Sequence, residues 1–135
     1  MKVTSKINLG LIIIISVFVL SGCASLKEKA RGFAGVSTKI LEEGRPNAIK
    51  EQVNLDFFTC FNKVKELLIK NGSYVYKEDV ANKLIAVYLS DTDTTPVGVF
   101  FTEAGANITQ MEVSSPSSYA KGVIAKVLDV LPKAE

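Results

Sequence analysis

The fold is decided by residues 73–114, which read SYVYKEDVANKLIAVYLSDTDTTPVGVFFTEAGANITQMEVS. Four segments in this stretch are rich in β-branched and aromatic residues, which predicts strands over 73–78, 84–90, 96–102 and 107–114. Short turn-rich or Gly-containing connections separate the segments, as is typical of hairpins. We therefore expect an antiparallel meander of four strands.

Helical patterns lie on both sides of this meander. Asp56 is a typical N-cap for a helix over 57–71, whose apolar residues recur at helical spacing. A period-two strand is expected just before it, over 49–55. After the meander, Ser115 followed by proline predicts the N-cap of a closing helix, which Pro132 ends.

The order of elements is therefore β-α-β-β-β-β-α, an α+β fold with an antiparallel sheet of four to five strands and two helices on one face. Pairing the hairpins by their turns places Tyr74 opposite Tyr88, Tyr76 opposite Ala86, and Gly98 beside Tyr88. One face of the sheet is almost wholly aliphatic, and we expect it to meet the helices. This face carries Val75, Ile85, Val87, Leu89, Val97, Val99, Phe101, Met111 and Val113.

The second face of the sheet is more apolar than an open face usually is, and it is a candidate interaction face. Its large side chains are Tyr74, Tyr76, Tyr88, Phe100 and Ile108. Its remaining residues are Ala86, Gln110 and Glu112.

Two explanations fit this second face. Either the preceding segment folds back over it through Phe33, Val36, Ile40 and Leu41, or it binds an envelope protein or a second copy of the chain. Tyrosine is also a normal cross-strand residue, so a half-exposed tyrosine row needs no partner at all.

The N-terminus has the parts of an export signal. Lys2 and Lys6 form a positive region, followed by the 12-residue apolar run 9–20. A bilayer-spanning helix needs about 20 apolar residues, so the run predicts a secretory signal rather than a transmembrane anchor. Leu20, Ser21, Gly22 and Cys23 follow the pattern of an aliphatic residue, two small residues and a cysteine, which resembles the lipobox of bacterial lipoproteins.

This resemblance implies cleavage before Cys23, diacylglycerol on the Cys23 thiol and a further fatty acyl group such as palmitate on that residue. Two or three acyl chains hold a protein firmly at a bilayer, whereas one chain does so only marginally. The implied location is the cell envelope. Ala24 and Ser25 after the cysteine, with no aspartate, resemble the pattern that directs a lipoprotein of a diderm bacterium to the outer membrane, facing the periplasm.

Three regions are therefore expected: a cleaved signal peptide over 1–22, an acylated tether over 23–47 and the α+β domain over 48–135. A short helix around 37–43 is expected within the tether. Without Lys2 and Lys6, the chain has 14 basic and 14 acidic residues. A neutral domain has no basic footprint, so we expect no nucleic-acid partner.

Residues 35–135 also resemble a group of small bacterial lipoproteins of unknown function. The likeness rests on RPNAI at 45–49, LIAVY at 84–88, TPVGVFF at 95–101 and SSPS at 114–117. This likeness implies the protein class and its location in the cell envelope. It implies no activity and no functional site.

The residues suggest no catalytic or metal site. The chain has no His, which excludes imidazole catalysis and His-ligated metals. Cys60 has neither an activating base nor a CxxC partner, so we expect a buried core residue. We expect no cofactor apart from the lipid on Cys23.

The segment 91–95, Asp-Thr-Asp-Thr-Thr, resembles the signature of haloacid-dehalogenase-like phosphatases, but the chain after it lacks the acidic pair that would hold Mg²⁺. It also fails as a calcium loop, because Pro96 stands where an EF-hand needs glycine. A hydroxyl-rich hairpin loop is the favoured interpretation. The turn 114–118 should lie at the same end of the sheet, where the two would form a polar rim. The candidate rim residues are Asp91, Asp93, Ser115 and Ser117.

The leading hypothesis is a membrane-anchored, non-enzymatic envelope lipoprotein that presents a small interaction domain. Its expected partners are membrane lipid through Cys23 and an envelope protein or a second copy. The alternative is a small hydrolase, or a ligand- or ion-binding protein, that uses the Asp91–Asp93 loop and the 114–118 rim.

Overall fold

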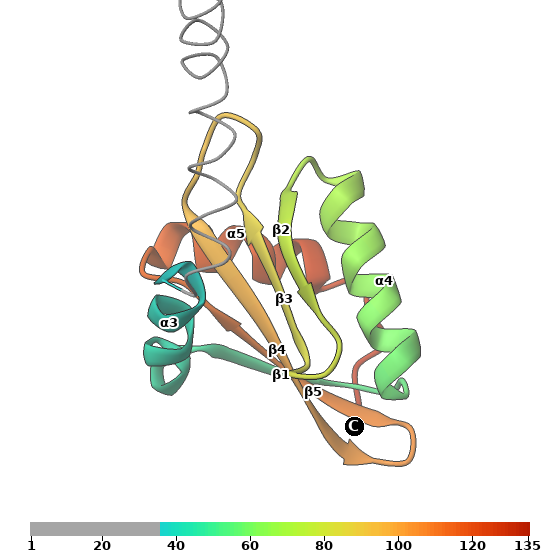
Figure 1. The fold of residues 1–135 in the computed structure, drawn as a ribbon. Helices are drawn as coiled ribbons and strands as arrows, with labels where there is room; N and C mark the ends of the chain where they lie inside the picture. Colours follow the sequence, from blue (N-terminus) through green and yellow to red (C-terminus); the bar gives the residue numbers. More distant parts are fainter. Residues whose placement is uncertain (1–35) are drawn as a thin grey trace, which may run out of the picture. The chain divides into compact units, whose positions relative to one another are not determined.

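A five-stranded antiparallel sheet with the strand order β1-β5-β4-β3-β2 forms the centre of the domain (Figure 1). The computed structural model describes residues 36–135, so the expected signal peptide, lipobox and Cys23 lie outside the described residues. The α+β class and the strand count predicted from the sequence are confirmed. The strands are β1 (Ile49–Val53), β2 (Tyr74–Asp79), β3 (Leu84–Tyr88), β4 (Pro96–Gly105) and β5 (Ile108–Ser114).

The β2–β3 hairpin differs in register from the prediction. Tyr74 lies opposite Tyr88, as expected. Beyond this pair, a β-bulge at Tyr76 places Lys77 opposite Ala86, so the predicted pairing of Tyr76 with Ala86 is wrong. The bulge inserts one extra residue into β2, which shifts every later pair by one position.

The β3–β4 hairpin also corrects one predicted neighbour. Gly98 pairs with Ala86 and does not lie beside Tyr88. The loop closes through a hydrogen bond of 3.1 Å from the Leu89 amide to the Thr95 carbonyl, and this closure sets the register of the two strands.

Helix α4 (Phe57–Lys70) begins and ends close to the predicted residues. The Asp56 side chain caps it by accepting a hydrogen bond from the Thr59 amide, and Asn71 is the C-cap. Gly72 follows with φ of +88°, a left-handed conformation that glycine adopts without strain.

Helix α5 (Ser118–Leu128) starts later than predicted. Its N-cap is Ser117, whose side chain accepts a hydrogen bond from the Ala120 amide. The predicted cap, Ser115, instead donates its hydroxyl to the Pro96 carbonyl over 2.7 Å. This bond holds the chain against the start of β4 before the helix can begin.

The segment after α5 closes the outer edge of β1. The Asn54 amide donates to the Pro132 carbonyl over 2.8 Å, and the Ala134 amide donates to the Gln52 carbonyl over 3.0 Å. Because this segment pairs with β1, the helix ends at Leu128, and the prediction that it runs to Pro132 is wrong.

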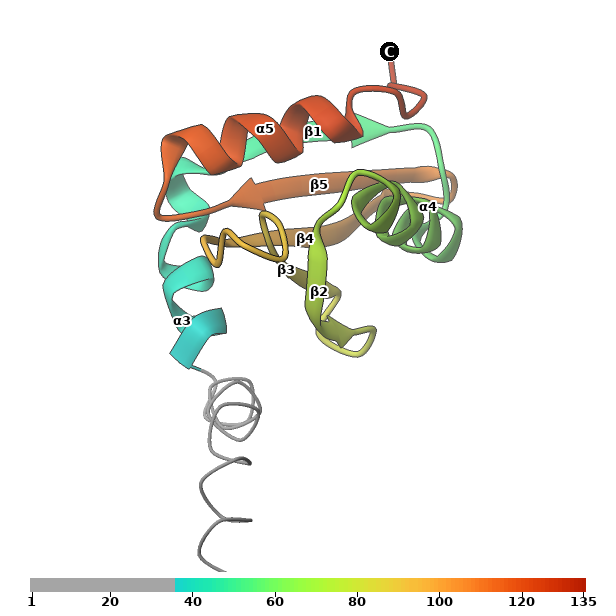
Figure 2. The same ribbon diagram turned by 90° about the horizontal axis from the view of Figure 1, so that it is seen from above.

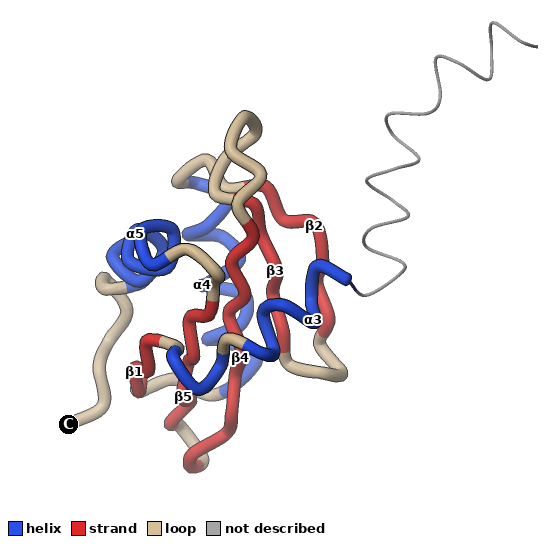
Figure 3. The backbone as a smooth tube through the Cα atoms, turned by 90° about the vertical axis from the view of Figure 1, so that its left-hand side faces the viewer, coloured by secondary structure: helices blue, strands red, loops and turns tan. Residues whose placement is uncertain are grey.

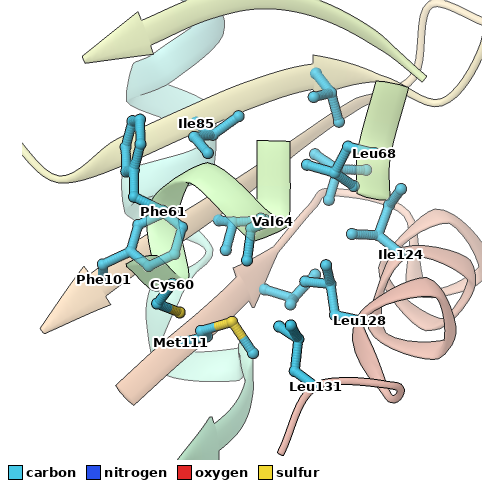
Figure 4. Packing of buried hydrophobic residues seen from close by; sticks show 14 of the residues in the cluster. Cys60, Phe61, Val64, Leu68, Ile85, Phe101, Met111, Ile124, Leu128 and Leu131 are labelled. Carbon is cyan, nitrogen blue, oxygen red and sulfur yellow. The ribbon is translucent and has the colours of Figure 1, made fainter. Parts of the chain in front are cut away.

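Helices α4 and α5 cover one face of the sheet and enclose the main core with it (Figure 4). Every strand residue predicted to face the helices belongs to this core or packs against it. The helices contribute Phe57, Cys60, Phe61, Val64, Leu68, Ala120, Ile124 and Leu128.

A third helix, α3 (Val36–Glu43), lies on the other side of the sheet, followed by the 3₁₀ turn η1 (Arg45–Asn47) (Figures 2 and 3). The predicted short helix around 37–43 is therefore confirmed. Leu41 of this helix is fully buried against the sheet, and the compact unit that contains the sheet begins at Gly35. No helix within 36–135 is both long and apolar enough to cross a membrane.

Candidate interaction surface

The second face of the sheet has a part that α3 covers and a part that it leaves open. Leu41 of α3 forms a small core with Leu84, Ala86 and Phe100, distinct from the main core. Gly98 makes room for this contact, since a Cβ atom there would lie 3.0 Å from Leu41 Cδ1. The helix therefore docks on a glycine in the middle of the sheet.

A buried hydrogen bond fixes the C-terminal end of α3. Ser114 at the end of β5 donates its hydroxyl to the Leu41 carbonyl over 2.6 Å. A Cβ atom on Gly44 would lie 2.7 Å from the same Ser114 oxygen. The turn after α3 thus needs a glycine to reach the sheet.

Arg45 in η1 makes the third attachment. Its Nε donates to Glu112 Oε2 on β5 over 2.7 Å, and its guanidinium lies 4.5 Å from the centre of the Phe100 ring. The Glu112 side chain is 12% exposed and the Arg45 side chain is 40% exposed, so the ion pair is desolvated mainly on its acidic side. Sequence patterns did not suggest these roles for Arg45 and Gly98, because both depend on where α3 docks.

Two residues of the predicted interaction face do not join the open part of this surface. Phe100 is 4% exposed and lies beneath Leu41 and Arg45, so it offers no surface to a partner. Ile108 is half-buried and pairs with Gly105 at the β4–β5 turn. That turn is at the opposite end of the sheet from the Tyr74–Tyr88 pair.

Beside the small core lie Tyr74, Tyr76 and Tyr88, which we call the tyrosine row. Tyr76 packs against the small core and its hydroxyl oxygen is buried, so the open part of the row is formed by Tyr74 and Tyr88. The Tyr76 and Tyr88 rings stack with their centres 4.3 Å apart, and those of Tyr74 and Tyr88 are 6.2 Å apart and nearly parallel. Tyr74 is 48% exposed, while the other two are half-buried. The structure therefore brings these three predicted residues together as a stacked set.

The bulge at Tyr76 also brings a charge to this surface. Lys77 lies in register with Ala86, whose side chain belongs to the small core under α3, so Lys77 shares the face of the tyrosine row. An unbroken alternation would have placed Lys77 on the helix side. No sequence signal identified this bulge, so Lys77 was not among the predicted surface residues.

In the predicted polar rim, the loop after β3 is held together by its own side chains. Asp93 Oδ1 accepts hydrogen bonds from the Thr95 amide at 3.0 Å and the Thr95 hydroxyl at 2.6 Å. These bonds lower the pKa of Asp93. Ser90 Oγ accepts from the Asp93 amide at 2.9 Å.

Within residues 36–135, no group of three or more acidic or Cys side chains is arranged to hold a metal ion.

The other part of the rim, the turn before α5, is attached to the start of β4, directly after this loop. Ser115 donates to the Pro96 carbonyl, so the two predicted rim segments lie at the same end of the sheet. Ser115 Oγ also accepts from the Ser117 amide, and Ser117 Oγ caps α5. These hydroxyls therefore serve the turn and the helix N-terminus.

Cys60 is fully buried in the main core, as predicted. Burial raises the pKa of its thiol to about 12, and the negative charge of Asp56 adds to the shift. A nucleophilic cysteine needs the opposite shift, because the thiolate is the reactive form.

A groove of about 320 Å³ separates α4 from the segment after α5. It was not predicted, because it exists only where the C-terminal segment crosses toward β1. Its lining combines apolar residues with lysine and glutamate side chains. The lining residues are Lys63, Glu66, Leu67, Lys70, Val130, Leu131 and Pro132.

Comparison of the chain with protein-family models and with curated proteins found no match. The functional assignment therefore rests on the geometry of this domain and on the sequence before it.

Proposed function

We propose that the protein is a membrane-anchored, non-enzymatic envelope lipoprotein that makes surface contacts through the tyrosine row. The lipobox-like sequence ending in Cys23 supports the anchor, with diacylglycerol and a fatty acyl group on that residue. In a diderm source, we propose the periplasmic side of the outer membrane.

The observation that carries the contact function is the division of the second sheet face. Helix α3 buries Phe100, Ala86 and Leu84, yet it leaves Tyr74 half exposed at the end of a stacked aromatic set. Exposed aromatic side chains that hold one another in place are typical of contact surfaces, because they bury a large area at little entropic cost.

The hydrolase or ion-binding alternative rests on the polar rim. Asp93, Ser115 and Ser117 hold their own turns together, and we find no specific observation that favours a ligand there.

The anchor is tested with Cys23→Ser in the full chain, expressed in a bacterial host with radiolabelled palmitate. We expect the wild-type protein to carry the label and to sediment with membranes, and the variant to be unlabelled and absent from them. Cys60→Ala is the matched control, because Cys60 is buried in the core, and it should stay labelled. Label and membrane association that persist in Cys23→Ser would contradict the proposal.

A further inference from the structure

We propose that the tyrosine row faces the membrane and contacts the headgroup region of the lipid bilayer. This inference rests on the proposed lipid anchor at Cys23 and names the partner of the surface described above. The partner that contacts the tyrosine row is the bilayer into which the acyl chains on Cys23 insert.

The first argument is where the chain enters the domain. The contacts of Leu41 place α3 on the same face of the sheet as Tyr76, and Figure 3 shows α3 on that side. The chain from Cys23 therefore reaches the domain at Val36, on the face of the tyrosine row.

The second argument is the length of this connection. Only 12 residues separate Cys23 from Val36, and such a segment spans at most about 45 Å when fully extended. A domain of about 100 residues has a radius of gyration near 13 Å. If the opposite face met the bilayer, the segment would have to pass around the domain, which would use most of its length. The face of α3 and the tyrosine row is thus the one that the anchor turns toward the bilayer.

The third argument is chemical. Tyr74, the exposed member of the row, has an apolar ring and a polar hydroxyl, and tyrosine is enriched where membranes meet water. Lys77 adds a cation on the same face for lipid phosphates. The connecting segment itself is basic, with Lys27, Lys29 and Arg31 against Glu28, which favours an anionic lipid surface.

The size of the surface argues against a protein occupant. A stable protein interface buries about 800 Å² on each partner, whereas a whole tyrosine side chain offers about 150–250 Å², and two of the three here are already half-buried. The bulge and Lys77 on edge strand β2 also work against pairing with another strand. A lipid contact can be small, because the anchor supplies a high effective concentration.

The experiment uses the absence of Trp from the chain, which makes one introduced Trp a unique fluorophore. Tyr74→Trp is placed in the full acylated chain, bound to phosphatidylethanolamine–phosphatidylglycerol vesicles with or without lipids brominated near the headgroup. The matched control is Tyr119→Trp, since Tyr119 is 74% exposed on α5, which packs against the opposite face. Far-ultraviolet circular dichroism checks that both variants are folded.

We expect brominated lipid to quench Trp at position 74 and to leave Trp at position 119 unquenched. Equal quenching, or quenching at position 119 alone, would overturn the inference. A blue-shifted but unquenched Trp at position 74 would also overturn it, in favour of a protein occupant such as a second copy. Mass spectrometry and vesicle flotation separate the two proposals. An acylated, vesicle-bound protein with an unquenched probe refutes this inference alone, whereas a protein without acyl groups refutes the proposed function, on which the inference rests.

Discussion

Leu41 Cδ1 lies 3.0 Å from the position that a Cβ atom on Gly98 would occupy, so α3 and β4 approach as closely as glycine allows. This close approach buries Leu41 completely, and Leu41 in turn covers the Phe100 ring. A side chain at position 98 must therefore displace the helix or distort the strand.

We predict that Gly98→Ala destabilises the domain by about 1–3 kcal/mol, the usual cost of overpacking a core. The measurement is the free energy of unfolding from urea denaturation, with limited proteolysis to detect release of α3. Gly122→Ala in α5 is the control, because a Cβ atom there meets nothing within 4 Å. That variant should be neutral or more stable by about 0.5–1 kcal/mol. Equal stability of Gly98→Ala and wild type would show that α3 does not dock as described.

The docking of α3 also shows where prediction from sequence reached its limit. Pairing the hairpins by their turns was enough to assign the core face of 84–90 and 96–102, because every second side chain of a strand faces the same side. A helix of only 8 residues has no comparable pattern, and its place depends on Gly98 and Ser114, which are far away in the sequence.

The bulge at Tyr76 is a second feature that the sequence did not predict. Both Tyr76 and Lys77 suit a regular strand, so the sequence offers no signal for an extra residue, and the predicted surface omitted Lys77.

The N-cap of α5 is a third feature that the sequence did not predict. Ser115 and Ser117 are equally good caps by residue type, and the contact with Pro96 decides between them.

The Arg45–Glu112 ion pair should be the strongest polar attachment of the α3 region. Arg45→Met leaves a carboxylate that is 12% exposed without its cation, and we expect a loss of about 1–3 kcal/mol. A double-mutant cycle with Glu112→Gln, followed by urea denaturation, measures the coupling between them.

The exposed pair Lys39–Glu43 is the control for this cycle. Its atoms are 3.9 Å apart and its side chains are 77% and 65% exposed, so Lys39→Met should change stability by less than about 0.5 kcal/mol. A coupling no larger than that of the exposed pair would show that the burial of Glu112 does not strengthen its pairing with Arg45.

Cys60 makes stability sensitive to alkaline pH. Burial raises the pKa of its thiol from 9.0 to about 12 in the folded state, so the folded protein holds this proton more tightly than the unfolded chain. The resulting stability is fully present below pH 9 and declines as pH rises from 9 toward 12.

Cys60→Ala removes this titration while keeping a small apolar side chain. We therefore expect the free energy of unfolding of the wild type to fall more steeply above pH 9 than that of the variant. A thiol reagent should likewise react with the Cys60 thiol only after denaturation. Parallel pH profiles for the two proteins, or rapid modification of Cys60 under native conditions, would show that the thiol is not buried.

Asp56 makes stability sensitive to acid. Hydrogen bonds from the side chain and then the backbone of Thr59 lower its pKa below 3.8 in the folded state. Because the folded pKa is depressed, the contribution is complete above pH 3.8 and is lost as pH falls through the folded value. Asp56→Asn keeps a good N-cap without the titration, so its thermal midpoint should fall less between pH 5 and pH 3. Asp56→Ala should melt below both proteins at neutral pH, and coincident midpoints would show that the cap does not stabilise α4.

Whether the polar rim binds an ion can be tested at the loop after β3 by measuring thermal midpoints with added ions. Asp93 would have to give up the Thr95 amide and hydroxyl before it could ligate a cation, and the local hydrogen bonds lower its pKa without any metal. We therefore expect Mg²⁺, Ca²⁺ and inorganic phosphate to leave the thermal midpoint unchanged in both wild type and Asp91→Asn. An increase in the wild type that is lost in Asp91→Asn would support the ligand-binding alternative and move the functional site from the tyrosine row to the rim. Charge screening by the added salt would shift both proteins alike, so the difference between them is the quantity that decides.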